Sequence, residues 1–441
     1  MRFIALWRNI RGSFWYLPAL YSVVAFILAL LTIRFDFYVT GNPMVSALVP
    51  SLLLSDKGLA QAVLSSISSS LLTMTTITFS TILVVLTTFL SNFSPRTLQN
   101  FITDHSTQRV LGSFVGGFVY SVVLLLLLRE TDDKSTFISP TFAIAVTILC
   151  LAVFVFFVHH TSLWIQVGNL IFHISTDTST IIKEQFPPKT SNLSDTWSET
   201  DFKEIKELPA IIINSPSSGY IDMIDEEGLM DMAIKRNCII RIERRQPDFV
   251  DEAAPLFSVW NTTEEELIEE LYNFVSIGPQ RAPYKDVEFG LRKLAEIALR
   301  AISPAVNDPN TAINSIEQIG NILTELGKRQ LPKPFRYDDK GQLRLIMEQP
   351  IFMDYLYASF YQIRHYSKED ISVIRSIVKA LTLIAESNDS DIQHTVWEFS
   401  IYIIEGIDMN SLLSLDKRYL NDLLLKLAKA CQKQHEFKLL Q

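Results

Sequence analysis

Hydroxyl side chains are concentrated in one uncharged stretch, residues 65–91, where 14 of 27 residues are serine or threonine. A hydroxyl group both donates and accepts hydrogen bonds, so a row of hydroxyls along a helix can replace water around a moving solute. At about 1.5 Å per residue, a helix of this length exceeds the hydrocarbon thickness of a bilayer. The chemistry that this stretch offers is therefore non-covalent: a water-lined path, or polar contacts between helices.

Projected on a helix, these hydroxyls form one narrow stripe that two apolar residues interrupt. We interpret the stripe as the lining of a pore, with Leu83 and Val84 as an apolar constriction that closes by dewetting. Close packing against another helix explains the same pattern, because serine and threonine also bond to carbonyls of their own helix. Both interpretations stay open at this point. The stripe consists of Ser66, Ser69, Thr73, Thr76, Ser80, Leu83, Val84, Thr87 and Ser91.

Metal ligation and covalent catalysis find little support in the residue pattern. The histidines near the end of the last apolar stretch have no H-x-x-x-H spacing and no acidic partner, and the cysteines have no C-x-x-C spacing. No nucleotide-binding, zinc-protease or nucleophile-elbow motif occurs, although an active site assembled from distant residues leaves no such motif. We therefore expect no metal, no cofactor and no identifiable enzyme site. The residues considered are His159, His160, His173, Cys150, Cys238 and Cys431.

One loop offers a second kind of polar site. The sequence SPAVNDPN, residues 303–310, separates two predicted helices. Asp286 opens the first of them, and Asp308 and Pro309 favour the start of the second. The free amides at a helix N-terminus can hold an anion or a phosphate. A sharp structural corner explains the loop equally well, and we favour the corner.

Four apolar stretches must position the hydroxyl stripe, and each is long enough to cross a membrane: residues 14–33, 65–91, 110–128 and 137–158. The third stretch has Gly112 and Gly116 at G-x-x-x-G spacing, and Gly117 lies next to Gly116 in the sequence. Another helix can therefore approach the backbone of this stretch closely. We expect the hydroxyl helix to be that partner, within one subunit or between subunits. The sequence thus predicts a homo-oligomer.

Charge divides the chain near residue 160. The first 160 residues carry nine Lys and Arg against six Asp and Glu, and the remainder carries 30 against 42. The acidic remainder argues against a nucleic-acid partner, because phosphate binding requires a basic surface. Short loops on the N-terminal side hold slightly more Lys and Arg than the opposite loops, which predicts that both termini are cytoplasmic.

Two segments of the chain carry a family resemblance. They are residues 89–120, FLSNFSPRTLQNFITDHSTQRVLGSFVGGFVY, and residues 288–312, EFGLRKLAEIALRAISPAVNDPNTA. With them the chain resembles a family of bacterial predicted membrane proteins known as a domain of unknown function. The resemblance covers nearly the whole chain and implies a bacterial plasma membrane protein with four spans and a cytoplasmic C-terminal half. It also implies a small barrel of biotinyl/lipoyl type. The turn at residues 246–250 lacks that fold's glycine and an exposed lysine, so we expect no covalently attached cofactor.

The expected fold is a four-helix transmembrane domain followed by an α+β soluble region with a helical C-terminal part. Helical periodicity continues past the fourth stretch, and we expect one rigid helix over residues 137–186 to connect the halves. The soluble half then serves as regulator of a pore. The alternative is a membrane scaffold or sensor that recruits a cytoplasmic protein or binds a small-molecule regulator. The expected divisions are residues 1–160, a connector at 161–186, a linker at 187–205, a β-rich module at 206–261 and helices at 262–441. Within the last division, Thr262 and Glu265 predict a capping box, and residues 335–347 predict a hairpin that turns at residues 338–341.

Overall fold

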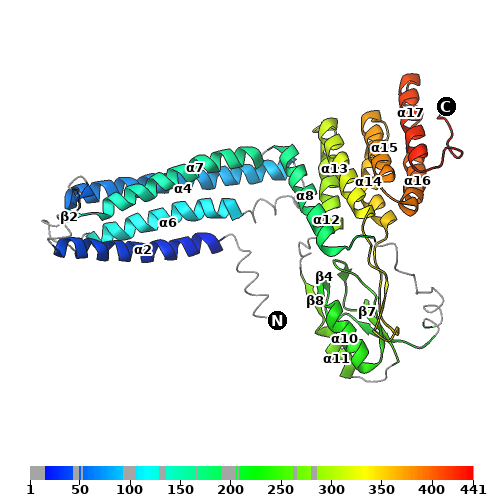
Figure 1. Ribbon diagram of the computed structural model, residues 1–441, viewed down its shortest axis with the longest axis horizontal. Helices are drawn as coiled ribbons and strands as arrows, with labels where there is room; N and C mark the ends of the chain where they lie inside the picture. Colours follow the sequence, from blue (N-terminus) through cyan, green and yellow to red (C-terminus); the bar gives the residue numbers. More distant parts are fainter. Residues whose placement is uncertain are drawn as a thin grey trace. The chain divides into compact units, whose positions relative to one another are not determined.

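The computed structural model describes residues 15–42, 49–50, 53–92, 105–128, 136–164, 166–189, 205, 208–261, 266–279 and 286–440. The chain divides into two compact units, Met1–Leu170 and Ile171–Gln441. Unit 1 holds four long apolar helices, and unit 2 holds a mixture of helices and sheets, as the sequence predicts (Figure 1). Most of the expected linker and the arginines of the N-terminal tail lie outside the described residues.

All four helices of unit 1 are long and apolar enough to cross a membrane. Helix α6 is the most buried of them and packs against each of the other three. The connections at one end of the helices pair as two short antiparallel strands, β1 (Ser55–Asp56) and β2 (Thr136–Phe137). The helices are α2 (Tyr16–Gly41), α4 (Lys57–Asn92), α6 (His105–Leu128) and α7 (Ser139–Trp164).

The connector consists of two helices, so the prediction of one continuous helix over residues 137–186 is wrong. Helix α7 ends at Trp164, and α8 (Val167–Gln185) begins three residues later. The side-chain amide of Asn169 donates to the carbonyl of Leu163 at 3.0 Å and to the side chain of Gln166 at 3.3 Å. Such a side-chain bond competes with the backbone hydrogen bonds of the helix. The periodicity of apolar residues does not reveal this competition.

The described strands of unit 2 form two sheets that share one apolar core, and the small barrel implied by the family resemblance stays a prediction. One has the order β3-β7-β5-β10-β9, and the other has the order β6-β4-β8. Strand β10 comes from far along the chain and pairs parallel with β5, while β9 and β10 form the hairpin expected at residues 335–347. Helix α10 (Glu226–Arg236) and α11 (Glu266–Tyr272) accompany the strands. The strands are β3 (Ile211–Asn214), β4 (Gly219–Ile224), β5 (Ile239–Ile242), β6 (Phe249–Val250), β7 (Pro255–Trp260), β8 (Val275–Gly278), β9 (Phe335–Tyr337) and β10 (Leu343–Met347).

Helices α12 to α17 of unit 2 form two rows (Figure 1). Helices α12, α14 and α16 pack in one row, and α13, α15 and α17 pack in the other. Stacked rows of this kind are typical of α-solenoids, whose helices bury one apolar face against each neighbour. The helices are α12 (Val287–Ala301), α13 (Pro309–Gly327), α14 (Phe352–Tyr366), α15 (Ile371–Glu386), α16 (Ser390–Glu405) and α17 (Ser414–Ala430).

Aspartates define where these helices start. Asp286 and Asp308 accept hydrogen bonds from the first-turn amides of α12 and α13, as predicted from the sequence. Asp370 and Asp389 do the same for α15 and α16. A carboxylate in this position satisfies amides that have no partner within the helix. The capping box expected at Thr262 lies outside the described residues.

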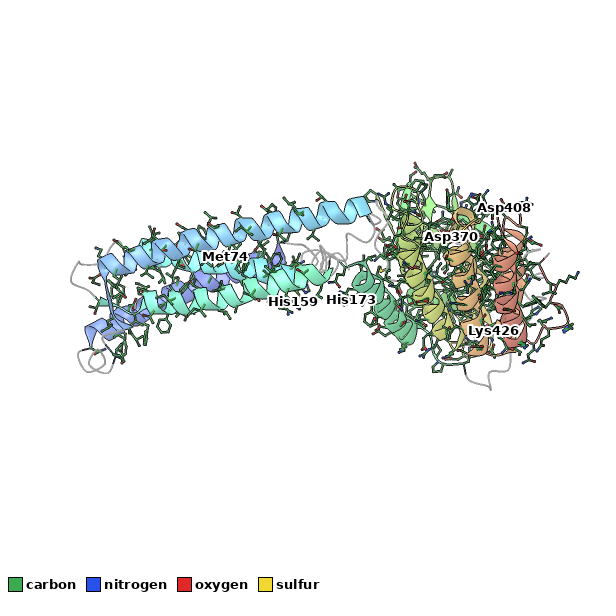
Figure 2. The ribbon with its side chains drawn as sticks, turned by 90° about the horizontal axis from the view of Figure 1, so that it is seen from above. Met74, His159, His173, Asp370, Asp408 and Lys426 are labelled. Atoms are coloured by element: carbon green, nitrogen blue, oxygen red, sulfur yellow. The ribbon has the colours of Figure 1, made fainter. Side chains whose placement is uncertain are left out.

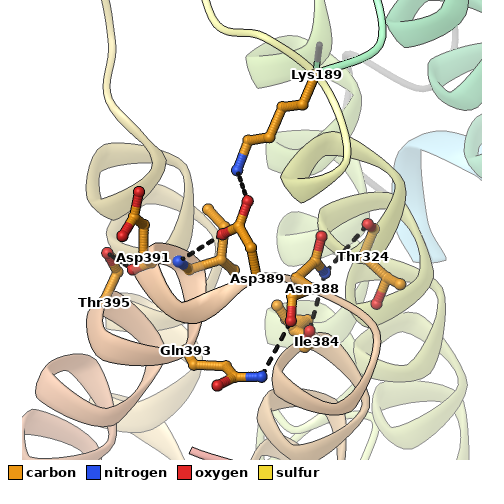
Figure 3. Close-up of polar contacts among 9 residues, drawn as sticks. Lys189, Thr324, Ile384, Asn388, Asp389, Asp391, Gln393 and Thr395 are labelled. Atoms are coloured by element: carbon orange, nitrogen blue, oxygen red, sulfur yellow. Dashed lines mark hydrogen bonds and ion pairs between the residues drawn. The ribbon is translucent and has the colours of Figure 1, made fainter. Parts of the chain in front are cut away.

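The segment after α8 is tied to the rows of helices. Pro188 forms an isolated bridge with Arg329, which lies two residues after the end of α13. Beyond it, Lys189 Nζ lies 2.6 Å from Asp389 Oδ2 in the turn between α15 and α16 (Figure 3). In the same turn, the Asn388 amide donates to the carbonyls of Thr324 and Ile384. Three segments that are distant in sequence therefore meet at one end of the rows.

Candidate functional sites

The hydroxyl stripe faces away from the other three helices. Its eight members from Ser66 to Thr87 are all exposed in the single chain, while the side chain of Ser91 lies outside the described residues. The opposite side of α4 is buried and apolar, with Leu64, Leu71 and Val85 packed against neighbouring helices. The stripe and the buried side are about 180° apart on the helix. Within unit 1, the hydroxyls of the stripe therefore point outward and do not lie between the four helices.

The apolar interruption of the stripe is exposed as well. Leu83 retains 47% of its accessible surface and Val84 retains 62%. The hydroxyls of Ser68 and Thr78, which lie off the stripe, are buried among the helices. Hydroxyls in the core and hydroxyls on the stripe are thus two separate groups on one helix.

Several threonines of the stripe bond to their own helix. Thr73 donates to the carbonyl of Ser69, Thr76 to that of Leu72, and Thr87 to that of Val84, at distances of 2.8 to 2.9 Å. These bonds satisfy the hydroxyl donors and leave oxygen lone pairs directed outward. The outward face therefore offers hydrogen-bond acceptors to whatever lies beside it.

The glycines of α6 pack mainly on α2, so the expectation that the hydroxyl helix covers them is wrong for Gly112 and Gly116. A Cβ atom at Gly112 would lie 3.2 Å from the Tyr21 ring, and one at Gly116 would lie 3.3 Å from the Tyr21 carbonyl oxygen. Gly117 does meet α4, because its Cβ would lie 3.2 Å from Leu71. The glycine face is covered within the chain, whereas most of the α4 stripe is not covered by any helix among the described residues of unit 1.

A buried carboxylate fastens α2 to α7. Asp36 is 2% exposed, and its Oδ1 accepts hydrogen bonds from the amides of Ile138 at 2.7 Å and Ser139 at 3.1 Å. These are amides at the start of α7, where a negative charge is favourable. No local pattern in the sequence marks Asp36 as a partner of Ile138 and Ser139, which lie far along the chain.

The remaining polar candidates do not assemble into a metal or anion site. Figure 2 shows His159 on α7 and His173 on α8; His160 stacks on Phe156 with ring centroids 5.5 Å apart. No three His, Cys, Asp or Glu side chains gather around a common point in the part of the chain that the structure describes. At the loop of residues 303–310, the Asp308 carboxylate already accepts the Thr311 amide and hydroxyl, which favours the structural corner.

Unit 2 contains a cleft of about 740 Å³ that sequence reasoning missed. Its walls come from many separate segments, so no local motif marks it. They include the end of α8 with residues 186–187, the turn that carries Arg245 and Gln246, the start of α12, residues 330–333, residues 347–350 and Tyr355 of α14. The start of α12 belongs to the segment on which the family resemblance rests.

The family model for predicted membrane proteins (DUF2254) matches residues 11–382. The chain belongs to the DUF2254 family. The match includes all four apolar helices, so the protein is a membrane protein with four apolar helices and a mixed soluble-type region. The DUF2254 description assigns no reaction and no ligand.

Relatives of this DUF2254 protein are found in mycobacteria. Uncharacterised proteins of Mycobacterium bovis and Mycobacterium tuberculosis are 28% identical to it over 344 residues. The alignment covers 75% of this chain and 64% of each relative, so the chain matches less than two thirds of the relatives' length. No solved structure matches the chain significantly.

Proposed function

We propose that this protein is an oligomeric channel or transport pore of the bacterial plasma membrane, with the hydroxyl stripe of α4 lining the path. The observation that carries the proposal is the position of the stripe, centred on the side of α4 opposite its buried face. If these eight outward residues faced lipid, their six hydroxyl groups would find no hydrogen-bond partners in the hydrocarbon. Facing an axis shared by several copies, they supply acceptors to water and to a passing solute.

In this proposal, Leu83 and Val84 form the constriction. They are the large apolar side chains within the stripe, and both are exposed. A narrow apolar ring excludes water and closes a path without a moving plug. Unit 2 then acts as the regulator on the cytoplasmic side. No charged residue lies in the stripe, so it favours no particular sign of ion.

The alternative function is a membrane-anchored scaffold or sensor. The two rows of helices in unit 2 favour it, because α-solenoids commonly offer extended binding surfaces. Exposed aromatic side chains such as Tyr357 and Tyr366 suit a protein partner. In that case, the stripe serves only as a contact between copies of α4.

Electrical recording in planar bilayers distinguishes the two functions. Replacing Leu83 or Val84 by serine hydrates the constriction, and we expect basal conductance to rise by about tenfold or more, which corresponds to a barrier lowered by about 1.4 kcal/mol. The same recordings are made on the wild-type protein after native mass spectrometry has established the oligomer. Silent oligomers for the wild type and both variants would favour the scaffold.

Val155 on α7 provides the matched control. It is 64% exposed, close to the 62% of Val84, but lies on a different helix. We expect Val155→Ser to leave the conductance unchanged. Val85 is unsuitable as a control because it is buried, and a serine there would weaken the packing of unit 1.

A further inference from the structure

A hydroxyl group on the lining of the unit 2 cleft has no hydrogen-bond partner among the described residues. It belongs to Tyr355, whose side chain is largely buried at 5% exposure. Burial, and then the negative charges of Asp286 and Glu288, raise the pKa of its phenol, so the group is a neutral donor at physiological pH. Buried polar groups normally have a partner, and one that faces a cleft is typical of a ligand site.

A cationic group accompanies this hydroxyl. Arg245 lines the same cleft, and its positive charge acts to lower the pKa of the Tyr355 phenol, against the larger effect of burial. Among the described residues, no carboxylate forms an ion pair with Arg245. A guanidinium presents paired donors that match the oxygens of a carboxylate or a phosphate.

The carboxylates around the cleft have other partners. Glu226 pairs with Arg336, and Glu288 pairs with Arg292. Asp286 accepts from the amide of Phe289 as the cap of α12. Two further charges on the lining, those of Lys333 and the exposed Glu348, have opposite signs. Of the two arginines on the lining, Arg245 is the one for which the described residues show no ion pair.

We propose that this cleft binds a metabolite-sized anion, with Arg245 pairing with the anionic group and the Tyr355 hydroxyl donating a hydrogen bond to an oxygen of the ligand. The volume of about 740 Å³ lies among those of small-molecule sites, about 300 to 1,000 Å³. Apolar side chains on the lining, including Phe186, Leu331 and Met347, cover the uncharged part of the ligand. The proposal does not depend on whether α4 lines a pore.

Arginine protection in the full-length protein in detergent tests the proposal. Phenylglyoxal modifies arginine, and peptide mass spectrometry reports its rate at Arg245 separately from other sites. The probes are AMP, an organic phosphate, and citrate, a carboxylate; adenosine is the uncharged control. We expect AMP or citrate to slow modification of Arg245 in a saturable way, by about tenfold when the probe is about tenfold above its dissociation constant. Which of the two protects identifies the anionic group.

Two controls make the test decisive. Arg418 on α17 lies outside the cleft, beside the ring of Tyr419, and its modification rate should not change. Tyr355→Phe removes only the hydroxyl, and we expect it to raise the half-protecting concentration by about tenfold, since a hydrogen bond to a charged group is lost. The proposal is overturned if neither anion protects Arg245, if adenosine protects as well as AMP, or if Tyr355→Phe protects like the wild type.

Discussion

At the scale of single residues, the pair formed by Lys189 and Asp389 links the exit of α8 to the turn before α16. Burial raises the pKa of the Asp389 carboxyl, but hydrogen bonds from Lys189 and from the Ile392 amide outweigh it and hold the pKa below the usual value. A carboxyl whose pKa is lower in the folded state stabilises the fold above its ordinary pKa. This contribution disappears as the pH falls through the folded-state pKa.

Lys189→Met should therefore destabilise the protein at neutral pH and not in acid. Both side chains are partly exposed, at 34% and 44%, so solvent screening limits the expected loss to about 0.5 kcal/mol. Urea unfolding at pH 7 and at about pH 2 measures it, since the folded carboxylate is protonated only below its lowered pKa. Asp389→Asn keeps a good helix cap and should reproduce the loss, whereas Asp389→Ala should cost about 1 kcal/mol more. An equal loss for Lys189→Met at both pH values would contradict this account.

At the scale of elements, the close contact between α8 and α12 depends on one glycine. A Cβ atom at Gly290 would lie 2.0 Å from Oγ1 of Thr178 and 2.9 Å from its Cβ. The Thr178 hydroxyl already donates to the carbonyl of Ile174 at 2.7 Å, so its rotamer is held. Gly290 belongs to the segment that carries the family resemblance, and the contact gives this residue a physical role.

Gly290→Ala should separate α8 from α12 and destabilise unit 2 by about 1 to 3 kcal/mol, the usual cost of overpacking. Urea unfolding of the full-length protein followed by circular dichroism measures the loss. Combining it with Thr178→Ala removes the two nearest atoms of the clash, and we expect the double variant to recover part of the stability. A Gly290→Ala protein as stable as the wild type would show that the two helices are not held by this contact.

At the scale of the whole molecule, the prediction concerns orientation. Strands β1 and β2 pair, which places the connection before α4 and the connection before α7 at the same end of the helices. The slight excess of Lys and Arg in the other loops indicates that this end faces outward. Reporter fusions after Gln99 and Ser191 should therefore give cytoplasmic signals, and a fusion after Lys134 should give an external one. An external signal at Ser191 would require an odd number of spans or the opposite orientation.

The sequence by itself determined the features that depend on neighbouring residues. Four apolar stretches predicted four membrane-length helices, because length and hydropathy are local properties. Asp286 and Asp308 predicted the starts of α12 and α13, since a cap bonds to amides three residues away. The turn at residues 338–341 predicted the hairpin of β9 and β10 for the same reason.

The tertiary structure alone decided which of several possible neighbours each surface meets. Gly112 and Gly116 approach α2, although their spacing suits any helix partner. Strand β10 pairs with β5 across about a hundred residues, as a comparison of their positions shows. The hydroxyl stripe was visible as a pattern, but its outward direction and the cleft at Tyr355 depend on contacts between segments distant in the chain. Such contacts are set by the packing of whole elements, and no local pattern of side chains encodes them.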